Sequence, residues 1–489
     1  MIKHRFRLAL LAALSLGAAR AQEAKPFLSP MFTDNMVLQR GIKAPVWGWT
    51  KPGEEVTVTV QGKTARAKAG ADGKWVAKVG PLTAGGPMHV DVVGSSQAML
   101  DNVLVGDVWI CSGQSNMEMG LRYVNNGDAE IAGATDPDIR VFRVPHTVAL
   151  KPLETPPGGP WQIGSPRTMG EGAAGMSAAA YFFARELRRK VGVPIGLVQT
   201  CWGGTYAESW TSREVLAKGF PEMADGLKNL DNWIAEGKPQ TSPYILSSLY
   251  NGMIAPVIPF GIKGAIWYQG EANANHAFRY RDLLPAMITD WRSRWGQKDF
   301  PFLIVQLANY MNTQSQPAES EWAELREAQL MTFENLPNTG LAVTIDIGEE
   351  KDIHPRNKQE VGRRLALAAE RVAYGRRGVA WSGPIYKGMK VKGSQALLSF
   401  RFTDGGLAAK GDKLTGFQIA GSDRKWFWAD ASISGKTVVV SSPSVSQPVA
   451  VRYAWGSNPI CNLYNGAGLP ASPFRTDDWP GMTVPKPAK

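Results

Sequence analysis

The sequence predicts an α/β protein in which a doubly wound parallel sheet is flanked by two β-rich regions. Three observations predict this class. Short β-type runs without a helical pattern fill residues 28–100, strand and amphipathic helix patterns alternate from about 101 to 375, and β-type runs return beyond about 376. Alternation of strands and helices is typical of a parallel sheet covered on both faces. At 489 residues, two or three domains are expected.

The first 21 residues predict a signal peptide. Lys3, Arg5 and Arg7 form a basic start, residues 8–19 form an apolar stretch, and residues 19–21 read Ala-Arg-Ala, an A-x-A cleavage site. The apolar stretch is too short to span a bilayer. We therefore expect an exported protein, periplasmic or secreted, that has no membrane partner.

Residues 22–100 predict an N-terminal β-sandwich-type domain. Val56, Val58 and Val60 alternate with polar residues, which is the period-two pattern of a half-buried strand. Further β-type runs lie at residues 44–49, 75–79 and 89–93. Several short strands separated by turn residues favour a small sandwich.

Residues 101–375 predict the parallel-sheet domain. Its strands are almost continuously apolar, as in 139–144 and 302–307, which is typical of strands buried on both faces. Apolar residues recur at helical spacing at Ala179, Phe182, Phe183, Leu187 and Val191, at Leu284, Met287, Ile288, Trp291 and Trp295, and at Val361, Leu365, Ala368 and Val372. Gly192 and Pro194 end the first of these helices.

Residues 376–489 predict a C-terminal β-rich domain. The helical patterns stop, and β-type runs appear at 395–402, 437–440 and 448–453. Neither an internal repeat nor a low-complexity linker separates the predicted domains, so we expect them to pack closely.

Four predicted strands end next to residues that can take part in acyl transfer. Strand 108–111 precedes Ser115, strand 195–200 precedes Gly203 and Gly204, strand 262–268 precedes Gln269, and strand 341–346 precedes Asp352 and His354. The carboxyl ends of parallel strands meet at one edge of a sheet. We therefore expect a nucleophile, oxyanion donors and a base to gather there.

Ser115 is the candidate nucleophile. Gly113 gives the backbone the freedom that a sharp strand-to-helix turn requires. Position 117 is Met, so the second glycine of the α/β-hydrolase G-x-S-x-G elbow is missing. Taken alone, a serine in such a turn could equally cap a helix.

His354 is the candidate base. Asp352 lies two residues before it and can orient its imidazole. Glu271 is an alternative acid, or a support for the loop. His146 lies in a loop without a nearby carboxylate in the sequence, and His276 follows a polar stretch that favours a surface or substrate-contact role.

The oxyanion donors predicted from the sequence are three. Gly204 can offer a backbone N–H, Gln269 a side-chain amide, and Ser115 its own backbone N–H. A plain turn at Gly204 and a capped strand end at Gln269 are the simpler alternatives.

Composition limits the partners. The net charge is +11, and four cations in the first 21 residues leave +7 for the rest, scattered rather than clustered. Nucleic acid binding needs a concentrated basic patch, so we expect no nucleic acid partner. Cys111 and Cys201 end apolar strands and are expected to be buried free thiols. No metal-binding or phosphate-binding motif is present, so we expect neither metal nor cofactor.

Four motifs in order resemble a known family, the sialate O-acetylesterase group of the SGNH (GDSL-like) hydrolases. These are Cys-Ser-Gly-Gln-Ser-Asn-Met at 111–117, Trp-Gly-Gly-Thr at 202–205, Trp-Tyr-Gln-Gly-Glu at 267–271 and Asp-Ile-His-Pro-Arg-Asn-Lys at 352–358. The resemblance implies a flavodoxin-like three-layer hydrolase domain, with Ser115 as nucleophile, His354 as base and Asp352 as its partner. It also implies that Ser115, Gly204 and Gln269 form the oxyanion hole.

The resemblance implies an exported carbohydrate O-acetylesterase, with acetylated sialic acid as the first substrate to consider. An esterase for plant polysaccharides (xylan, xyloglucan, pectin) is an alternative, and a non-catalytic glycan-binding protein is an alternative of another class. Candidate sugar contacts are Trp202, Trp210, Trp267, Tyr268 and Asn273, and candidate partners for a sugar carboxylate are Arg122, Arg143 and Arg356. The sequence predicts no oligomeric state.

Overall fold

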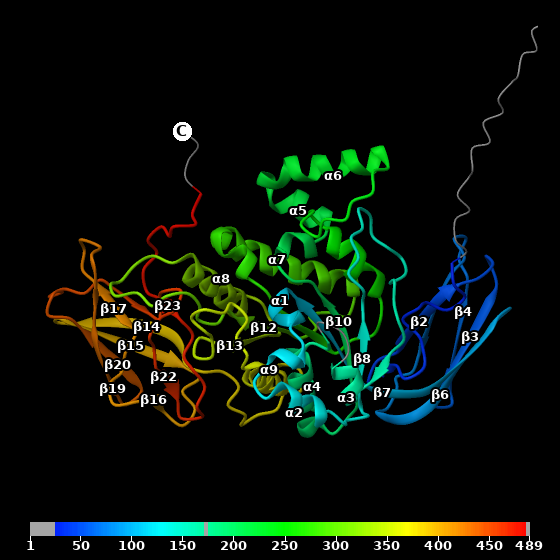
Figure 1. Ribbon diagram of the computed structural model, residues 1–489, viewed down its shortest axis with the longest axis horizontal. Helices are drawn as coiled ribbons and strands as arrows, with labels where there is room; N and C mark the ends of the chain where they lie inside the picture. Colours follow the sequence, from blue (N-terminus) through cyan, green and yellow to red (C-terminus); the bar gives the residue numbers. More distant parts are fainter. Residues whose placement is uncertain (1–24, 171–174, 486–489) are drawn as a thin grey trace, which may run out of the picture.

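The computed structural model describes residues 25–170 and 175–485, and a mostly parallel sheet forms its centre (Figure 1). The strand order is β13 (Thr339–Val343), β12 (Phe302–Gln306), β11 (Gly264–Tyr268), β7 (Gln97–Gly113), β10 (Ile195–Cys201), β8 (Ile139–Arg143) and β9 (Gln162–Ile163). Every pairing along this path is parallel except that of β9. The α/β prediction is confirmed. The predicted signal peptide lies outside the described residues.

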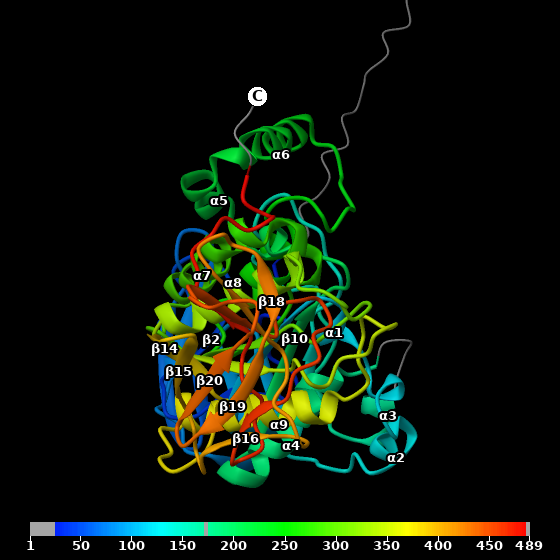
Figure 2. The same cartoon turned by 90° about the vertical axis from the view of Figure 1, so that its left-hand side faces the viewer.

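Helices cover both faces of this sheet. Figures 1 and 2 show α7 (Ala277–Trp295) and α8 (Glu321–Asn335) on one side, and α4 (Ala178–Val191) and α9 (Lys358–Val372) on the other. The helical patterns predicted for α4, α7 and α9 are confirmed, and their apolar residues lie in the core. The other α-helices are α1 (Ser115–Glu118), α2 (Gly127–Ala132), α3 (Pro166–Gly170), α5 (Arg213–Gly219) and α6 (Ala224–Glu236).

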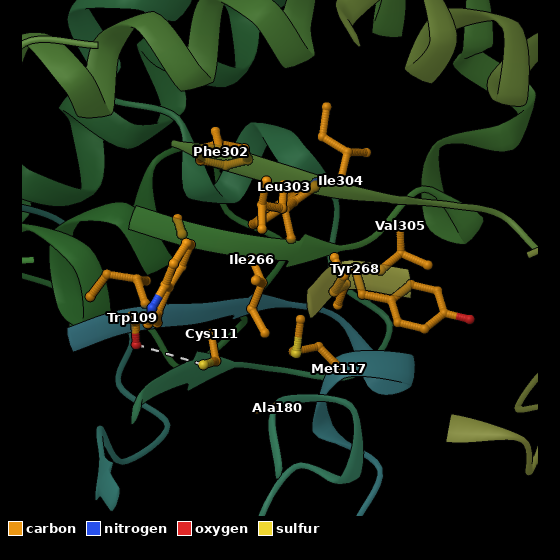
Figure 3. Close-up of a cluster of buried hydrophobic side chains, with 14 of the residues drawn as sticks. Trp109, Cys111, Met117, Ala180, Ile266, Tyr268, Phe302, Leu303, Ile304 and Val305 are labelled. Carbon is orange, nitrogen blue, oxygen red and sulfur yellow. Dashed lines mark hydrogen bonds between the residues drawn. The ribbon is translucent and has the colours of Figure 1, made fainter. Parts of the chain in front are cut away.

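The core beneath the carboxyl edge of the sheet is dense and aromatic. Trp109 of β7 is fully buried and packs edge-on against Phe183 of α4, with ring centroids 5.0 Å apart. Figure 3 shows Cys111 and Ile266 from neighbouring strands in the same cluster, close to Met117 of α1. An aromatic pair of this kind adds about 0.5–1.5 kcal/mol beyond its buried area. The strand ends that carry the site therefore stand on a rigid base.

Strand β7 joins the N-terminal region to the central sheet. It pairs with β6 (Gly85–Val93) and β1 (Val37–Gln39) before entering the central sheet, so the predicted boundary at residues 100 and 101 falls inside one strand. The other N-terminal strands are β2 (Ala44–Trp49), β3 (Glu55–Val60), β4 (Lys63–Lys68) and β5 (Lys74–Val79). In β3 every second residue is buried, which confirms the period-two pattern.

The C-terminal region consists of antiparallel sheets packed against α8. Buried Arg326 of α8 donates to the carbonyls of Gly456 and Ser457, at 2.7 and 2.8 Å. Within residues 373–485 the structure contains strands and no helix. The strands are β14 (Ile385–Lys392), β15 (Gln395–Arg401), β16 (Leu407–Ala409), β17 (Phe417–Ala420), β18 (Trp426–Trp428), β19 (Asp430–Ser434), β20 (Thr437–Ser441), β21 (Ala450–Tyr453), β22 (Leu463–Asn465) and β23 (Phe474–Arg475).

Candidate active site

The carboxyl ends of β7, β10 and β11 lie side by side. Gly113, the last residue of β7, is opposite Cys201 at the end of β10 and Tyr268 at the end of β11. The chain leaves β7 to build the sheet on both sides, and the crevice outside such a switch point is the usual ligand site of an open α/β sheet. The residues that follow these strands therefore meet at one edge, as predicted.

The turn between β7 and α1 requires Gly113. Its φ is +140°, and a Cβ atom would lie 2.1 Å from the carbonyl oxygen of Tyr268. The side-chain oxygen of Gln114 accepts the N–H groups of Gly270 and Ala272, at 3.3 and 3.2 Å. The strand end, the turn and the loop after β11 are thus fixed together, and Ser115 begins α1.

Ser115 and His354 are in direct contact. Ser115 Oγ lies 2.9 Å from His354 Nε2, although 239 positions separate the two residues. Asp352 Oδ1 accepts the backbone N–H of His354 at 2.8 Å and lies 3.6 Å from its Nδ1. Burial lowers the pKa of His354, the positive charge of Lys358 lowers it further, and Asp352 raises it. A neutral imidazole beside a serine hydroxyl is the arrangement that general-base activation needs.

Glu271, the alternative acid, hydrogen-bonds to Asn116 rather than to His354. Its Oε1 accepts from Asn116 Nδ2 at 2.5 Å, and burial raises the pKa of this carboxyl. Of the two acids, the structure brings Asp352 to His354 and places Glu271 beside Asn116.

The Gly-Gly turn packs directly against Ser115. A Cβ atom on Gly203 would lie 3.3 Å from Ser115 Cβ, and the N–H of Gly203 donates to Glu118 Oε2 at 2.6 Å. Gly204 has a φ of +73° and is exposed. Among the described residues, no acceptor binds the backbone N–H of Gly204 or that of Ser115. Both N–H groups are therefore available to a ligand.

Gln269 differs from its predicted role. Its amide nitrogen donates to the carbonyl oxygen of Thr205 at 3.1 Å and to Asn273 Oδ1 at 2.6 Å, while its oxygen accepts from Tyr280. The backbone N–H of Ala207 fixes Asn273 Oδ1 as an acceptor. Both amide hydrogens of Gln269 are thus directed at protein atoms, and in this structure neither is free for an oxyanion.

The predicted aromatic platforms are core residues. Trp210 and Trp267 are 0% exposed and Tyr268 is 1% exposed, so the prediction that they stack on a sugar is wrong. Trp267 packs edge-on against both Trp210 and Trp291 of α7, whereas the ring of Tyr268 faces Lys358 of α9. Asn273 is also fully buried and donates to Glu208 at 2.8 Å. Trp202 is the exception, since it is only half-buried.

Trp202 belongs to a group that includes a carboxylate missed in the sequence. His146 stacks on Trp202 with ring centroids 4.1 Å apart, and its Nε2 lies 2.9 Å from Glu118 Oε1. We expected His146 to lack a carboxylate, which is wrong because Glu118 of α1 supplies one from a distant part of the chain. Glu118 follows Ser115 by one helical turn, and that spacing was the only signal in the sequence.

A pocket of about 520 Å³ opens at Ser115. It is lined by Ser115, Glu118, Met119, Gly120, Arg122, Tyr123, Val124, Asp352, His354 and Arg356. Arg122 and Arg356 bring positive charge to it, whereas Arg143 donates to the carbonyl oxygen of Thr168 at 2.6 Å and does not line it. On the Gly204 side, the hydroxyl of Tyr244 lies 3.4 Å from the position of a Gly204 Cβ, and Tyr244 is 55% exposed. Sequence patterns had not indicated Tyr123 or Tyr244.

Across residues 25–170 and 175–485, no cluster of three or more His, Cys, Asp or Glu side chains could hold a metal ion. No helix in those ranges is both long and apolar enough to cross a bilayer. Cys111 and Cys201 are buried free thiols, as predicted.

Comparison with known proteins identifies the family. Residues 105–371 match the family described as carbohydrate esterase, sialic acid-specific acetylesterase. The chain belongs to this family. Mouse sialate O-acetylesterase is 34% identical over 91% of this chain and 93% of its own, and the human protein is 33% identical over 92% of each.

A solved structure extends the likeness to the whole fold. A carbohydrate acetylesterase from Xanthomonas citri superposes with a TM-score of 0.83 at 41% identity, over 92% of this chain and 99% of that one. The protein is therefore a carbohydrate esterase, and the pocket at Ser115 lies within the matched family region.

Proposed function

We propose that the protein removes O-acetyl groups from sialic acids by a serine-esterase mechanism. The observation that carries this proposal is the 2.9 Å contact between Ser115 Oγ and His354 Nε2, both of which line the pocket. Ser115 Oγ attacks the acetyl carbonyl while His354 takes its proton. His354 then protonates the sugar oxygen as the C–O bond breaks, and a water activated by His354 hydrolyses the acetyl-enzyme to acetate. Asp352 holds the imidazolium that forms in each step.

The oxyanion is proposed to bind between the backbone N–H groups of Ser115 and Gly204. Neither group has an acceptor among the described residues. The loss of one such donor costs about 10²–10³ in kcat in a well-studied serine protease. Gln269 supports this hole indirectly, because it holds the carbonyl of Thr205, the residue after Gly204.

Two arginines among the residues that line the pocket support an anionic sugar. Arg122 and Arg356 line it, and a sialic acid carries a carboxylate that a guanidinium can bind through two parallel hydrogen bonds. Tyr123 also lines the pocket and is 49% exposed, which gives a sugar ring a flat surface. The names of the mouse and human relatives point to the same substrate class. Neither the plant-polysaccharide alternative nor the non-catalytic alternative is favoured by these relatives.

Acetate release tests the proposal. Wild-type protein is offered acetylated sialic acid, acetylated xylan and p-nitrophenyl acetate, beside the Ser115→Ala variant. We expect release from the sialic acid that Ser115→Ala abolishes. Arg122→Gln and Arg356→Gln should raise KM for the sialic acid and leave turnover of the neutral p-nitrophenyl ester unchanged. Retained activity in Ser115→Ala would refute the mechanism, and a preference for xylan that neither arginine variant alters would refute the substrate.

Two further predictions accompany this function. We propose that the central domain has the SGNH three-layer fold and that the flanking regions are sandwich-type domains, supported by the motif order and by the antiparallel sheets on both sides. We also propose export, with cleavage after residue 21. The N-terminal sequence of protein recovered from the cell exterior or periplasm would test the cleavage site.

A further inference from the structure

A buried cluster of three polar residues lies behind the Ser115–His354 pair. It consists of Asn116, Glu271 and Lys358, which belong to three separate segments. Lys358 is 0% exposed. Its Nζ donates to Asn116 Oδ1 at 2.6 Å and to the carbonyl of Pro355 at 2.7 Å. No step of the proposed mechanism uses this lysine.

Asn116 connects the cation to the anion. Its Oδ1 accepts from Lys358, while its Nδ2 donates to Glu271 Oε1 at 2.5 Å and to the carbonyl of Ile353 at 2.9 Å. The amide therefore lies between a positive charge at its oxygen and a negative charge at its nitrogen. Hydrogen bonds to ionised groups are roughly twice as strong as neutral ones, and each polarises the next. The three side chains act as one unit.

The cluster holds His354 from both sides. Ile353 and Pro355 are its two neighbours in the chain, and the cluster binds the carbonyl of each. Asn116 is the residue directly after Ser115. The same amide is thus attached to the backbone of the nucleophile and, through hydrogen bonds, to the backbone of the base.

We propose that Lys358 is a positioning residue that, with Asn116 and Glu271, fixes the backbone of His354 so that its Nε2 faces Ser115 Oγ. This inference rests on the proposed function. A shift of 1 Å in such a pair can cost about 100-fold in rate. Because Lys358 has no exposed surface, it makes no contact with substrate, and its effect falls on kcat rather than on KM.

The charge on Lys358 makes this positioning sensitive to pH. Glu271, Asp352 and Glu349 face it and favour the ammonium, the ring of Tyr268 lies 5.3 Å from Nζ, and His354 is the nearby base. Burial outweighs the acids and lowers the pKa of Lys358 to about 7. The protonated fraction therefore falls as pH rises through that value. A neutral amine keeps its hydrogen bonds but loses the charge assistance, so kcat should decline towards a plateau at alkaline pH.

Three variants test the proposal: Lys358→Met, Glu271→Gln and, as a matched control, Lys351→Met. Lys351 is an exposed lysine of the loop that carries Asp352 and His354 and leads into α9. The measurements are kcat and KM for acetate release between pH 5 and 10, with Tm for each variant. Lys358→Met should lower kcat about 100-fold with KM changed less than about twofold, and its alkaline decline should disappear. Glu271→Gln removes an anion that favours the ammonium, so the decline should move to lower pH. Lys351→Met should match the wild type.

Two outcomes would overturn the proposal. One is a folded Lys358→Met protein with wild-type kcat. The other is a Lys358→Met protein whose Tm and activity both fall while the shape of its pH profile stays that of the wild type. That result would indicate a purely structural role for Lys358. If Lys358→Met does not fold, the pH profile of Glu271→Gln decides between the outcomes. If kcat of Glu271→Gln declines at the same alkaline pH as that of the wild type, the proposal is overturned. Failure of the proposed function is separate, because it shows as activity retained in Ser115→Ala.

Discussion

Replacing Asp352 by asparagine should weaken the base by a moderate amount. Asp352 Oδ1 lies 3.6 Å from His354 Nδ1. Two unit charges at that distance attract with about 1 kcal/mol in water and about 5 kcal/mol at an effective dielectric constant of 20. The two side chains are 45% and 40% exposed, so solvent screens them and the lower part of this range applies. A loss of about 1–2 kcal/mol corresponds to a fall of roughly 5- to 30-fold in kcat/KM.

The assay is acetate release across pH for Asp352→Asn, with Glu350→Gln as control. Asparagine still accepts the backbone N–H of His354, which Asp352 binds at 2.8 Å, so the loop should keep its shape. Asp352 raises the pKa of His354, and its removal should therefore move the acid limb of the profile to lower pH. Glu350 is exposed in the same loop, and its variant should behave as the wild type.

Two results would refute this reasoning. A fall of about 10⁴-fold in kcat/KM for Asp352→Asn would mean that Asp352 and His354 are fully desolvated in the complex with substrate, as in a buried protease triad. The second result is a fall of less than twofold in kcat/KM for Asp352→Asn, together with an acid limb of the pH profile that moves only in Glu271→Gln. It would mean that Glu271, and not Asp352, orients His354.

Three other predictions follow from the contacts around the site. Gly203→Ala should lower kcat about 10- to 100-fold at unchanged Tm, because the new Cβ would lie 3.3 Å from Ser115 Cβ. Steady-state kinetics and a melting curve check this prediction, and an unchanged kcat would contradict it. Tyr244→Ala should raise KM for an acetylated sugar a few-fold and leave KM for p-nitrophenyl acetate unchanged, since Tyr244 is 55% exposed beside Gly204. Equal changes of KM for both esters would exclude a contact between Tyr244 and the sugar. Cys111 and Cys201 should resist thiol reagents in the native protein and react after denaturation, because burial raises the pKa of both; rapid labelling of native protein would contradict their burial.

The sequence was most informative where one physical rule governs a whole segment. A strand buried on both faces must be apolar throughout, and a parallel strand must deliver its next residue to the carboxyl edge of the sheet. These two rules were enough to predict that Ser115, Gly204 and His354 meet at one edge of the sheet, although they are far apart in the chain. The helix that ends at Gly192 was equally clear, since Gly192 adopts the left-handed conformation expected after a helix.

Pattern alone could not say which face of a strand end meets the substrate. Trp267 and Tyr268 end β11 and precede Gln269, so the motif suggested that all three lie at the site. Both faces of β11 are covered, and the two aromatic rings therefore point into the core. The same limit applies to Gln269, whose amide hydrogens are bound by Asn273, four residues later, and by Thr205, which lies 64 positions away.

Pairings between segments far apart in the chain could not be predicted for a related reason. Glu118 meets His146, and Asn116 meets Lys358, across 28 and 242 positions, and charge patterns along a chain carry no record of such contacts. The predicted boundary at residues 100 and 101 falls inside β7. The polar residues Asp101 and Asn102 are of the kind that marks a turn, although the strand continues through them from the N-terminal sheet into the central sheet.

Lys358 gives the strongest argument that the buried cluster serves the site. It occupies the first turn of α9, where a sequence pattern would predict a solvated charge, and it is instead fully buried. Burying an ion pair costs desolvation, and apolar side chains of similar volume are often as stable. Stability alone therefore does not explain a lysine here. An apolar side chain could fill the space of Lys358, but it could not donate to the carbonyl of Pro355 on one side of His354. Nor could it donate to Asn116, whose amide binds the carbonyl of Ile353 on the other side.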